Sequence, residues 1–335
     1  MIYTDVVVIG AGPVGLFAVF ECGMQRLKCC LFDSLDHLGG QCAALYPEKP
    51  IYDIPTHSSI TGEDLVNRLI DQMKVFEPQI FLKEQIEKLE KNEDQTFKVT
   101  GSRGTVVRCK AVVIAAGVGA FGPNRPPLEG IEHYEGQSVL YSVLNREQYR
   151  DKKVVIAGGG DSAVDWALSL SEIASDVTVV HRRSKFRCLP ESQKQLEELA
   201  SVGKIQLAVP YQLSQLKGDN AQITHVGIST IEGEYKEIEA DFLLPFFGLS
   251  MNLGPILDWD LALSKNCITV DPSTSETSVP GVFAVGDIST YKNKQKLILT
   301  GFAEAALAAK MVRQLLYPDE VVHFEYSTSQ GIPQI

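Results

Sequence analysis

Short apolar runs that end in a glycine turn recur along the chain. They are VVVIGAGPVG (6–15), VVIAAG (112–117), VVIAGGGDSA (154–163) and VPGVFAVGD (279–287). An apolar run bounded by glycine is typical of a buried strand, and the periodic segments near 62–76 and 301–316 predict helices. Short strands are also expected at 80–89 and 96–109, with a loop at 38–42. Strands that alternate with helices in this way predict an α/β fold.

Two of these runs carry the same glycine fingerprint in the same register. Its three positions are Gly10, Gly12 and Gly15 in the first run and Gly158, Gly160 and Ala163 in the second. In a βαβ dinucleotide-binding unit, the first glycine makes a tight turn and the second lets the backbone approach the pyrophosphate. The third position lets helix and strand pack closely, and the helix N-terminus stabilises the phosphate charge. One such motif also marks ordinary turns, but two in matched register predict two dinucleotide sites.

The two units differ at the position expected beside the adenosine ribose. Counting 23 residues from the first glycine reaches Asp33 in one unit and His181 in the other, where Arg182 and Arg183 follow. A carboxylate accepts hydrogen bonds from ribose hydroxyls, whereas a His-Arg-Arg cluster would bind a 2′-phosphate. The second dinucleotide is therefore predicted to be NADPH rather than NADH. A solvated charged loop is the alternative interpretation of the basic cluster, and His181 could also bond only locally.

The order of these motifs predicts two Rossmann-like dinucleotide-binding domains, one inserted into the other. The proline-rich stretch GPNRPP (122–127) suits a hinge. We expect the NADPH-binding domain over 119–246, and the other domain over 1–118 and 247–335 with a short C-terminal tail from about 318.

This insertion would return Asp287, late in the sequence, to the first cofactor. Asp287 ends an apolar strand directly after Gly286. A buried carboxylate is costly unless it accepts hydrogen bonds, and the ribityl hydroxyls of a flavin are suitable donors.

Composition and charge limit the cellular compartment and the binding partners that we expect for this protein. The net charge of −11 argues against nucleic acid or anionic membranes as partners, and no apolar run is long enough for a membrane span. No signal peptide is recognisable, and the seven cysteines include no CxxC pair. We therefore expect a cytoplasmic protein whose thiols are buried and reduced, without a metal site.

The motif order resembles that of the two-dinucleotide-binding-domain flavoproteins of the thioredoxin-reductase-like group. Within this group, three segments are similar to ferredoxin–NADP⁺ reductases: GGQCAALYPEK (39–49), GGGDSAVDWAL (158–168) and the tail YSTS (326–329). The resemblance covers essentially the whole chain. It implies bound FAD, hydride exchange with NADP(H), and a homodimer. Asp33 departs modestly from the family, where glutamate is common at this position.

A thioredoxin reductase needs a dithiol, which in that family lies just before the second glycine fingerprint. The matching stretch here, YSVL (141–144), contains no cysteine. The flavin must then pass electrons directly to an acceptor, and ferredoxin or flavodoxin, as a one-electron carrier, is a natural partner. Two alternatives remain: an NADPH oxidase or disulfide reductase of the same fold with another acceptor, and a non-catalytic NADPH-sensing flavoprotein.

The resemblance also implies roles for single residues of the FAD site. Tyr46 would stack on one face of the isoalloxazine, where the alternative is a half-exposed loop tyrosine. Gln41 would contact FAD, Ile86 would offer backbone groups to the adenine, and Phe121 would pack on the cofactor.

The C-terminal tail would complete this site in the family. Tyr326 would cover the opposite flavin face, with Thr328 as a hydrogen-bonding neighbour of the ring. In related dimers such a tail comes from the partner subunit; a disordered terminus is the alternative here.

Two further groups of charged residues carry weaker expectations. Lys292, Lys294 and Lys296 could attract an acidic ferredoxin or form a solvated loop. Asp161 and Asp165 are expected only to favour a helix start.

Overall fold

The computed structural model describes residues 1–320, 328 and 331–333, except the side chains of 120, 121 and 249–251. The chain forms two compact units: Met1–Phe121 with Met251–Ile335, and Gly122–Ser250. It passes between them in β11 (Ala120–Pro123) and β19 (Leu249–Asn252), which pair with each other. We call these parts unit 1 and unit 2. No helix in the described part of the chain is long and apolar enough to span a bilayer.

Unit 1 is built on a five-stranded parallel sheet of order β22-β10-β2-β3-β6. Its strands are β2 (Val6–Ile9), β3 (Cys29–Phe32), β6 (Gln79–Phe81), β10 (Ala111–Ile114) and β22 (Val282–Ala284). All four neighbouring pairs run parallel. The central strand β2 is buried on both faces, which explains its continuous apolar sequence.

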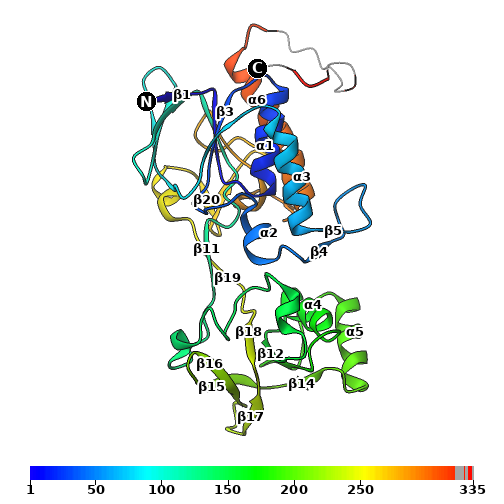
Figure 1. Cartoon of the computed structure of the whole chain (residues 1–335). Helices are drawn as coiled ribbons and strands as arrows, with labels where there is room; N and C mark the ends of the chain where they lie inside the picture. Colours follow the sequence, from blue (N-terminus) through cyan, green and yellow to red (C-terminus); the bar gives the residue numbers. More distant parts are fainter. Residues whose placement is uncertain (321–327, 329–330, 334–335) are drawn as a thin grey trace. The chain divides into compact units, whose positions relative to one another are not determined.

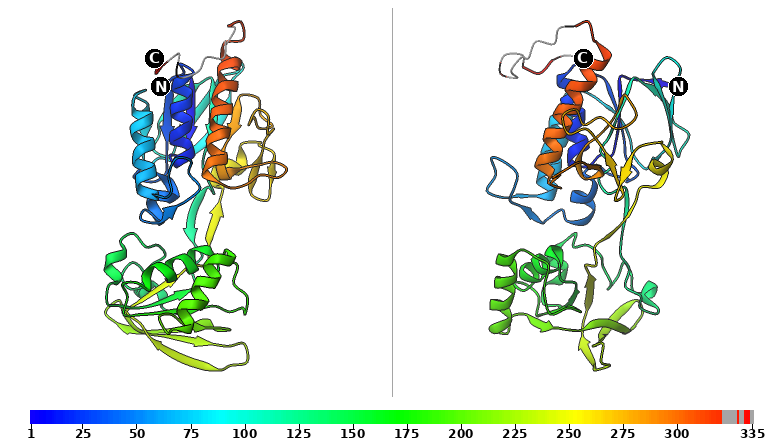
Figure 2. Two further views of the ribbon diagram at one scale, coloured as in Figure 1. Left: turned by 90° about the vertical axis from the view of Figure 1, so that its right-hand side faces the viewer. Right: turned by 180° about the vertical axis from the view of Figure 1, so that it is seen from behind.

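Alternate residues of β2 enter two separate cores. Val6 and Val8 pack against the helices α1 (Pro13–Met24), α3 (Gly62–Lys74) and α6 (Ile298–Leu316). Figures 1 and 2 show these three helices side by side. Val7 and Ile9 pack on the opposite face, against a second sheet of order β1-β9-β8-β7. That sheet consists of β1 (Ile2–Tyr3), β7 (Ile86–Lys91), β8 (Phe97–Gly101) and β9 (Val106–Cys109).

Shorter elements complete unit 1 around the carboxyl edge of its parallel sheet. They are α2 (Gly40–Leu45), β4 (Pro50–Ile51), β5 (Ile60–Thr61), β20 (Leu263–Ser264), β21 (Cys267–Thr269), β23 (Ser289–Thr290) and the 3₁₀ turns η3 (Gly254–Asp258) and η4 (Gly286–Ile288). In α3, the buried positions Leu65, Leu69 and Met73 recur at helical spacing. The Thr61 hydroxyl caps this helix by accepting a 3.1 Å bond from the Asp64 N–H.

Unit 2 is also built on a parallel sheet, with four strands instead of five. Its parallel sheet, β14-β13-β12-β18, comprises β12 (Lys153–Ala157), β13 (Asp176–Val180), β14 (Gln206–Ala208) and β18 (Phe242–Pro245). Helices α4 (Asp161–Leu170) and α5 (Pro190–Ser201) accompany it, with the 3₁₀ turns η1 (Ile131–His133) and η2 (Arg146–Tyr149). An antiparallel sheet adds β15 (Gln212–Asp219), β16 (Gln222–Ser229) and β17 (Tyr235–Glu239).

The predicted α/β fold with parallel sheets is confirmed, and several predicted boundaries need correction. The strands expected at 80–89 and 96–109 are each divided in two, because turns interrupt them. The expected loop at 38–42 is wrong in its second half, since Gly40 begins α2. The glycine pair predicted a loop instead of this helix, because glycine has a low helix propensity.

The packing of α1 on β2 predicts a stability difference between the two glycine fingerprints. A Cβ at Gly15 would lie 1.8 Å from the Gly10 carbonyl oxygen, so Gly15→Ala forces backbone apart. We expect a loss of about 1–3 kcal/mol in unfolding free energy, although alanine is the better helix former. The matched variant Ala163→Gly, at the buried third position of unit 2, should cost about 0.5–1 kcal/mol. Urea unfolding of the apoprotein measures both, and a Gly15→Ala protein as stable as the wild type would contradict this packing argument.

Candidate functional site

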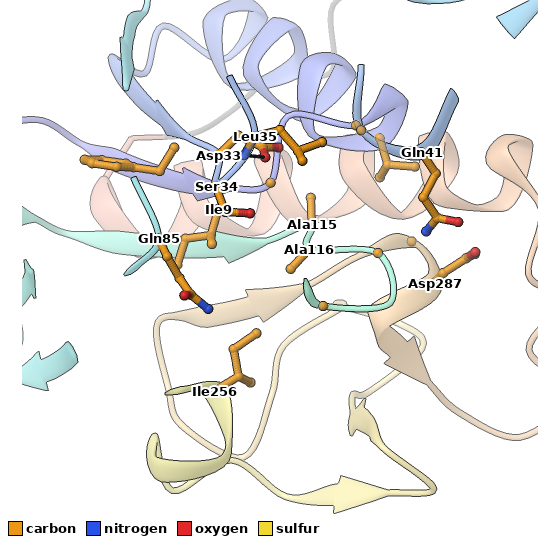
Figure 3. Close-up of a pocket in the computed structure, with 18 of the residues that line it drawn as sticks. Ile9, Asp33, Ser34, Leu35, Gln41, Gln85, Ala115, Ala116, Ile256 and Asp287 are labelled. Carbon is orange, nitrogen blue, oxygen red and sulfur yellow. Dashed lines mark hydrogen bonds between the residues drawn. The ribbon is translucent and has the colours of Figure 1, made fainter. Parts of the chain in front are cut away.

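A cavity in unit 1 lies at the carboxyl ends of its parallel strands. It is lined by residues that follow β2, β3, β10 and β22: Gly10, Gly12, Asp33, Ser34, Ala116, Gly117, Gly286 and Asp287. Figure 3 shows Gln41 and Asp287 at one end of this cavity and Gln85 at the other. Ligands of open parallel sheets bind at this edge, because the loops after the strands converge there.

The glycine turn after β2 presents bare backbone to this cavity. Gly10 has a φ of +102°, and a Cβ there would lie 2.4 Å from the Ala115 carbonyl oxygen. Gly12 is the N-cap of α1 and, having no side chain, gives the helix no side-chain cap. The first backbone N–H groups of α1 are therefore available to an anion, and the helix dipole favours negative charge there.

Asp33 stands at the end of β3 and lines the same cavity. Its Oδ2 accepts a 2.6 Å bond from the Ala11 N–H, and its Oδ1 accepts a 2.8 Å bond from the Leu35 N–H. Burial raises the pKa of Asp33, and these backbone bonds oppose that shift. The carboxylate is thus fixed in direction and keeps acceptor capacity for ribose hydroxyls.

Ile86 lines the same cavity, as do Gln85, Ile256 and Trp259. The last two residues were not expected from the sequence. They come from η3 and the residue after it, and no local pattern marks them as ligand contacts.

The other end of the cavity combines an amide, a phenol and a carboxylate. Gln41 lies on α2, and Tyr46 is the C-cap of this helix. The Cys42 thiol donates to the Tyr46 hydroxyl oxygen at 3.6 Å, and burial raises the pKa of Tyr46. Burial also raises the pKa of Asp287, while the positive charges of Lys296 and Lys294 lower it. All four residues Gln41, Cys42, Tyr46 and Asp287 line the cavity.

The lysine run that follows Asp287 does not form one basic surface. Lys294 is buried and pairs with Glu304, a buried carboxylate of α6. Both expectations for this lysine, an exposed docking charge and a solvated loop, are therefore wrong. Lys292 and Lys296 are exposed, and Lys296 also lines the cavity. Glu304 was missed, although a lone acid within the apolar stretch FAEAALAA is a readable signal.

Unit 2 carries the second glycine turn after β12. The backbone of Gly158 packs closely against that of Phe246, since a Cβ on Gly158 would lie 2.7 Å from the Phe246 carbonyl oxygen. Gly160 is the N-cap of α4 and supplies no side-chain cap. The basic loop after β13 folds over this turn: the Arg187 N–H donates to the Gly159 carbonyl at 2.6 Å.

A second bond holds the same loop. The Leu189 N–H donates to Asp161 Oδ1 at 2.9 Å. Asp161 therefore does more than favour a helix start.

His181 and the two arginines that follow it have different environments. His181 is buried, its Nε2 lies 3.2 Å from the Lys185 carbonyl oxygen, and its ring centroid lies 5.0 Å from that of Phe186. Burial lowers the pKa of His181, and Arg187, Arg183 and Arg182 lower it further. The neutral ring thus bonds locally and supports the loop. The exposed side chains of Arg182 and Arg183 form no ion pair within the described part of the chain.

Three residues predicted for the first cofactor site have no described place in this cavity. Phe121 belongs to β11, but its side chain is not among those described. Tyr326 lies outside the described residues. Thr328 is exposed and does not line the cavity of unit 1.

Comparison with known proteins identifies the family. A model of the pyridine nucleotide-disulphide oxidoreductase family matches residues 4–309. A ferredoxin–NADP reductase of Paramagnetospirillum magneticum is 54% identical, with 99% of this chain and 98% of the relative covered. One of Granulibacter bethesdensis is 55% identical, with 99% and 95% covered.

Solved structures show the same fold. The thioredoxin reductase of T. acidophilum has a TM-score of 0.81 at 24% identity, covering 94% of this chain and 99% of that one. That of Lactococcus lactis has a TM-score of 0.80 at 24% identity and the same coverage. From the family match and the full-length relatives, the chain belongs to the pyridine nucleotide-disulphide oxidoreductase family and, within it, to the ferredoxin–NADP reductases.

Proposed function

We propose that the chain is an FAD-dependent ferredoxin–NADP⁺ reductase. The observation that carries this proposal is the pair of glycine turns, one beside a fixed carboxylate and the other beside exposed arginines. The overall exchange is NADPH + 2 oxidised ferredoxin ⇌ NADP⁺ + H⁺ + 2 reduced ferredoxin. Bound flavin supplies the conversion between a hydride and single electrons. The described residues bind and orient the two nucleotides.

FAD suits the cavity of unit 1 better than FMN. Its two ends offer different groups, since Asp33 lies near the glycine turn and Asp287 lies with Gln41. The N–H groups of α1 would bind the pyrophosphate, Asp33 the ribose and Asp287 the ribityl hydroxyls. Tyr46 would stack on the ring. FMN would leave the Asp33 end without a partner.

The state of the thiols supports direct electron transfer from flavin to the acceptor. Six of the seven cysteines are buried, and Cys188 is half-buried. Burial raises the pKa of Cys42 to about 11 and that of Cys109 to about 12, so neither is a thiolate at neutral pH. Reduced thiols of this kind suit the cytoplasm.

The homodimer and the tail extend this proposal. We place Tyr326 and Thr328 of the partner subunit near the flavin, on the strength of the YSTS tail alone. In this arrangement, the nicotinamide displaces Tyr326 before hydride transfer.

FAD binding is the first test. The wild-type protein should be yellow with non-covalent FAD, and Asp33→Ala should weaken FAD binding about 10- to 100-fold. The reason is the loss of charge-assisted hydrogen bonds worth about 1.5–3 kcal/mol. Fluorescence titration of apoprotein with FAD measures this, and Asp71→Ala, on the exposed face of α3, is the control. A colourless protein that takes up neither FAD nor FMN would rule out the proposed function.

Nucleotide selectivity tests the basic loop. Arg182→Ala with Arg183→Ala should reduce kcat/KM for NADPH by about two decades, chiefly through KM, and leave NADH nearly unchanged. This magnitude follows from two charge-assisted hydrogen bonds to a 2′-phosphate, whose contribution is reduced by solvent screening. Lys204→Ala, another exposed cation of unit 2, should change neither value. Equal efficiency of the wild type with both nucleotides would refute the assignment.

Thiol independence tests the electron path. Alkylation of the accessible cysteines should leave NADPH-driven ferredoxin reduction within about twofold of the untreated rate, because no thiolate lies on the path. Thioredoxin should not be reduced efficiently. Circular dichroism before and after alkylation controls for unfolding, and loss of ferredoxin reduction in a still-folded protein would show that a thiol takes part.

A further inference from the structure

A buried ion pair stands directly behind the cavity wall of unit 1. Glu304 projects from α6 and accepts hydrogen bonds from three groups: the Gly286 N–H at 2.8 Å, the Tyr291 hydroxyl at 2.7 Å and the Lys294 ammonium. The Ser289 hydroxyl oxygen lies 3.4 Å from the same carboxylate. The exposed fractions are 8% for the Glu304 side chain and 4% for that of Lys294. The carboxylate is thus fully satisfied inside the protein.

Stability alone is a poor explanation for this pair. Removing two charges from water costs several kcal/mol per ion in effective terms, about as much as their attraction returns. An apolar pair of the same volume would often serve the core equally well. The other ion pairs of the described residues have at least one side chain that is more exposed than either partner here.

The pair contacts the cavity through the turn that carries Asp287. Glu304 holds the Gly286 N–H, Lys294 donates to the Ser289 hydroxyl at 3.3 Å, and Ser289 in turn donates to the Gly286 carbonyl at 2.9 Å. Gly286 and Asp287 both line the cavity. The field of the pair reaches that wall, since Glu304 raises the pKa of Asp287 and Lys294 lowers it.

Flavin reduction changes the charge inside this cavity. A hydride brings two electrons and one proton, so NADPH becomes NADP⁺ and the cavity gains one negative charge. A nearby fixed anion opposes that gain and a nearby fixed cation favours it, and low dielectric surroundings strengthen both effects. Glu304 and Lys294 together are close to neutral, so each offsets the other.

We propose that Glu304 and Lys294 are positioning residues whose opposite charges balance each other's effect on the reduction potential of the bound flavin, acting through the Gly286–Asp287 turn. This inference rests on the proposed function, because it needs flavin in the cavity. Each partner alone biases the potential in the opposite direction, and the neutral pair holds the turn in place without a net bias.

Three variants test the proposal by the sign of their effects. Glu304→Gln keeps an acceptor for the Gly286 N–H but removes the negative charge, so the midpoint potential should become less negative. Lys294→Met removes the positive charge, so the potential should become more negative. The double variant should return close to the wild-type potential, because it removes both charges. Anaerobic equilibration of the holoenzyme with a reference dye measures all three potentials.

Two controls distinguish an effect of charge on the flavin potential from a general loss of stability. Glu90→Gln neutralises one partner of an exposed pair with Lys98 in the same unit, so it should leave the potential unchanged. Tyr291→Phe removes a hydrogen bond to Glu304 but no charge, and it should lower the melting temperature without a comparable shift in potential. Should one single variant fold poorly, the other still shows the sign of its own shift, and the absence of a shift there would overturn the inference.

The outcomes are distinguishable from failure of the proposed function. Shifts of the same sign in both single variants, or no shift in either, would overturn the inference while leaving a functional flavoenzyme. A double variant far from the wild-type potential would also overturn it. A wild-type protein without flavin would instead refute the proposed function itself.

Discussion

The close approach of helix α1 to strand β2 is the constraint on which unit 1 depends. Gly15 allows it, because any side chain there would overlap the Gly10 carbonyl, and Gly10 needs its positive φ to make the turn. The approach brings the N-terminus of α1 to the carboxyl edge of the sheet. There it meets the loops after β3, β10 and β22, so one packing contact brings together the backbone and side chains that line the cavity.

Unit 2 uses the same turn but places different side chains beside it. In unit 1, a single carboxylate held by two backbone N–H groups follows β3. In unit 2, a loop follows β13 whose arginines are exposed to solvent while the buried His181 supports it from within. Two copies of one supersecondary unit thereby acquire separate tasks. The proposed electron path needs both tasks and no cysteine.

The sequence predicts those features that depend on local spacing. The glycine positions, Asp33 and Asp287 follow from short-range rules about turns and strand ends, and all of them lie where the rules place them. Lys294 could not be assigned, because its pairing with Glu304 depends on how the loop folds back on helix α6, which local sequence rules do not predict. Trp259 and Ile256 reach the cavity through η3, whose position is set by tertiary packing alone. The bond of His181 Nε2 to the Lys185 carbonyl is consistent with the local role that the sequence left open for this residue.

Anaerobic stopped-flow measurement can follow electrons from NADPH through the flavin to ferredoxin. The holoenzyme is mixed first with NADPH and then with oxidised ferredoxin, while the flavin absorbance is followed. We expect rapid bleaching by NADPH, much slower bleaching by NADH, and recovery of the oxidised spectrum as ferredoxin is reduced. Flavin that NADPH bleaches but ferredoxin does not reoxidise would contradict the proposed electron path, because the electrons would then need another acceptor.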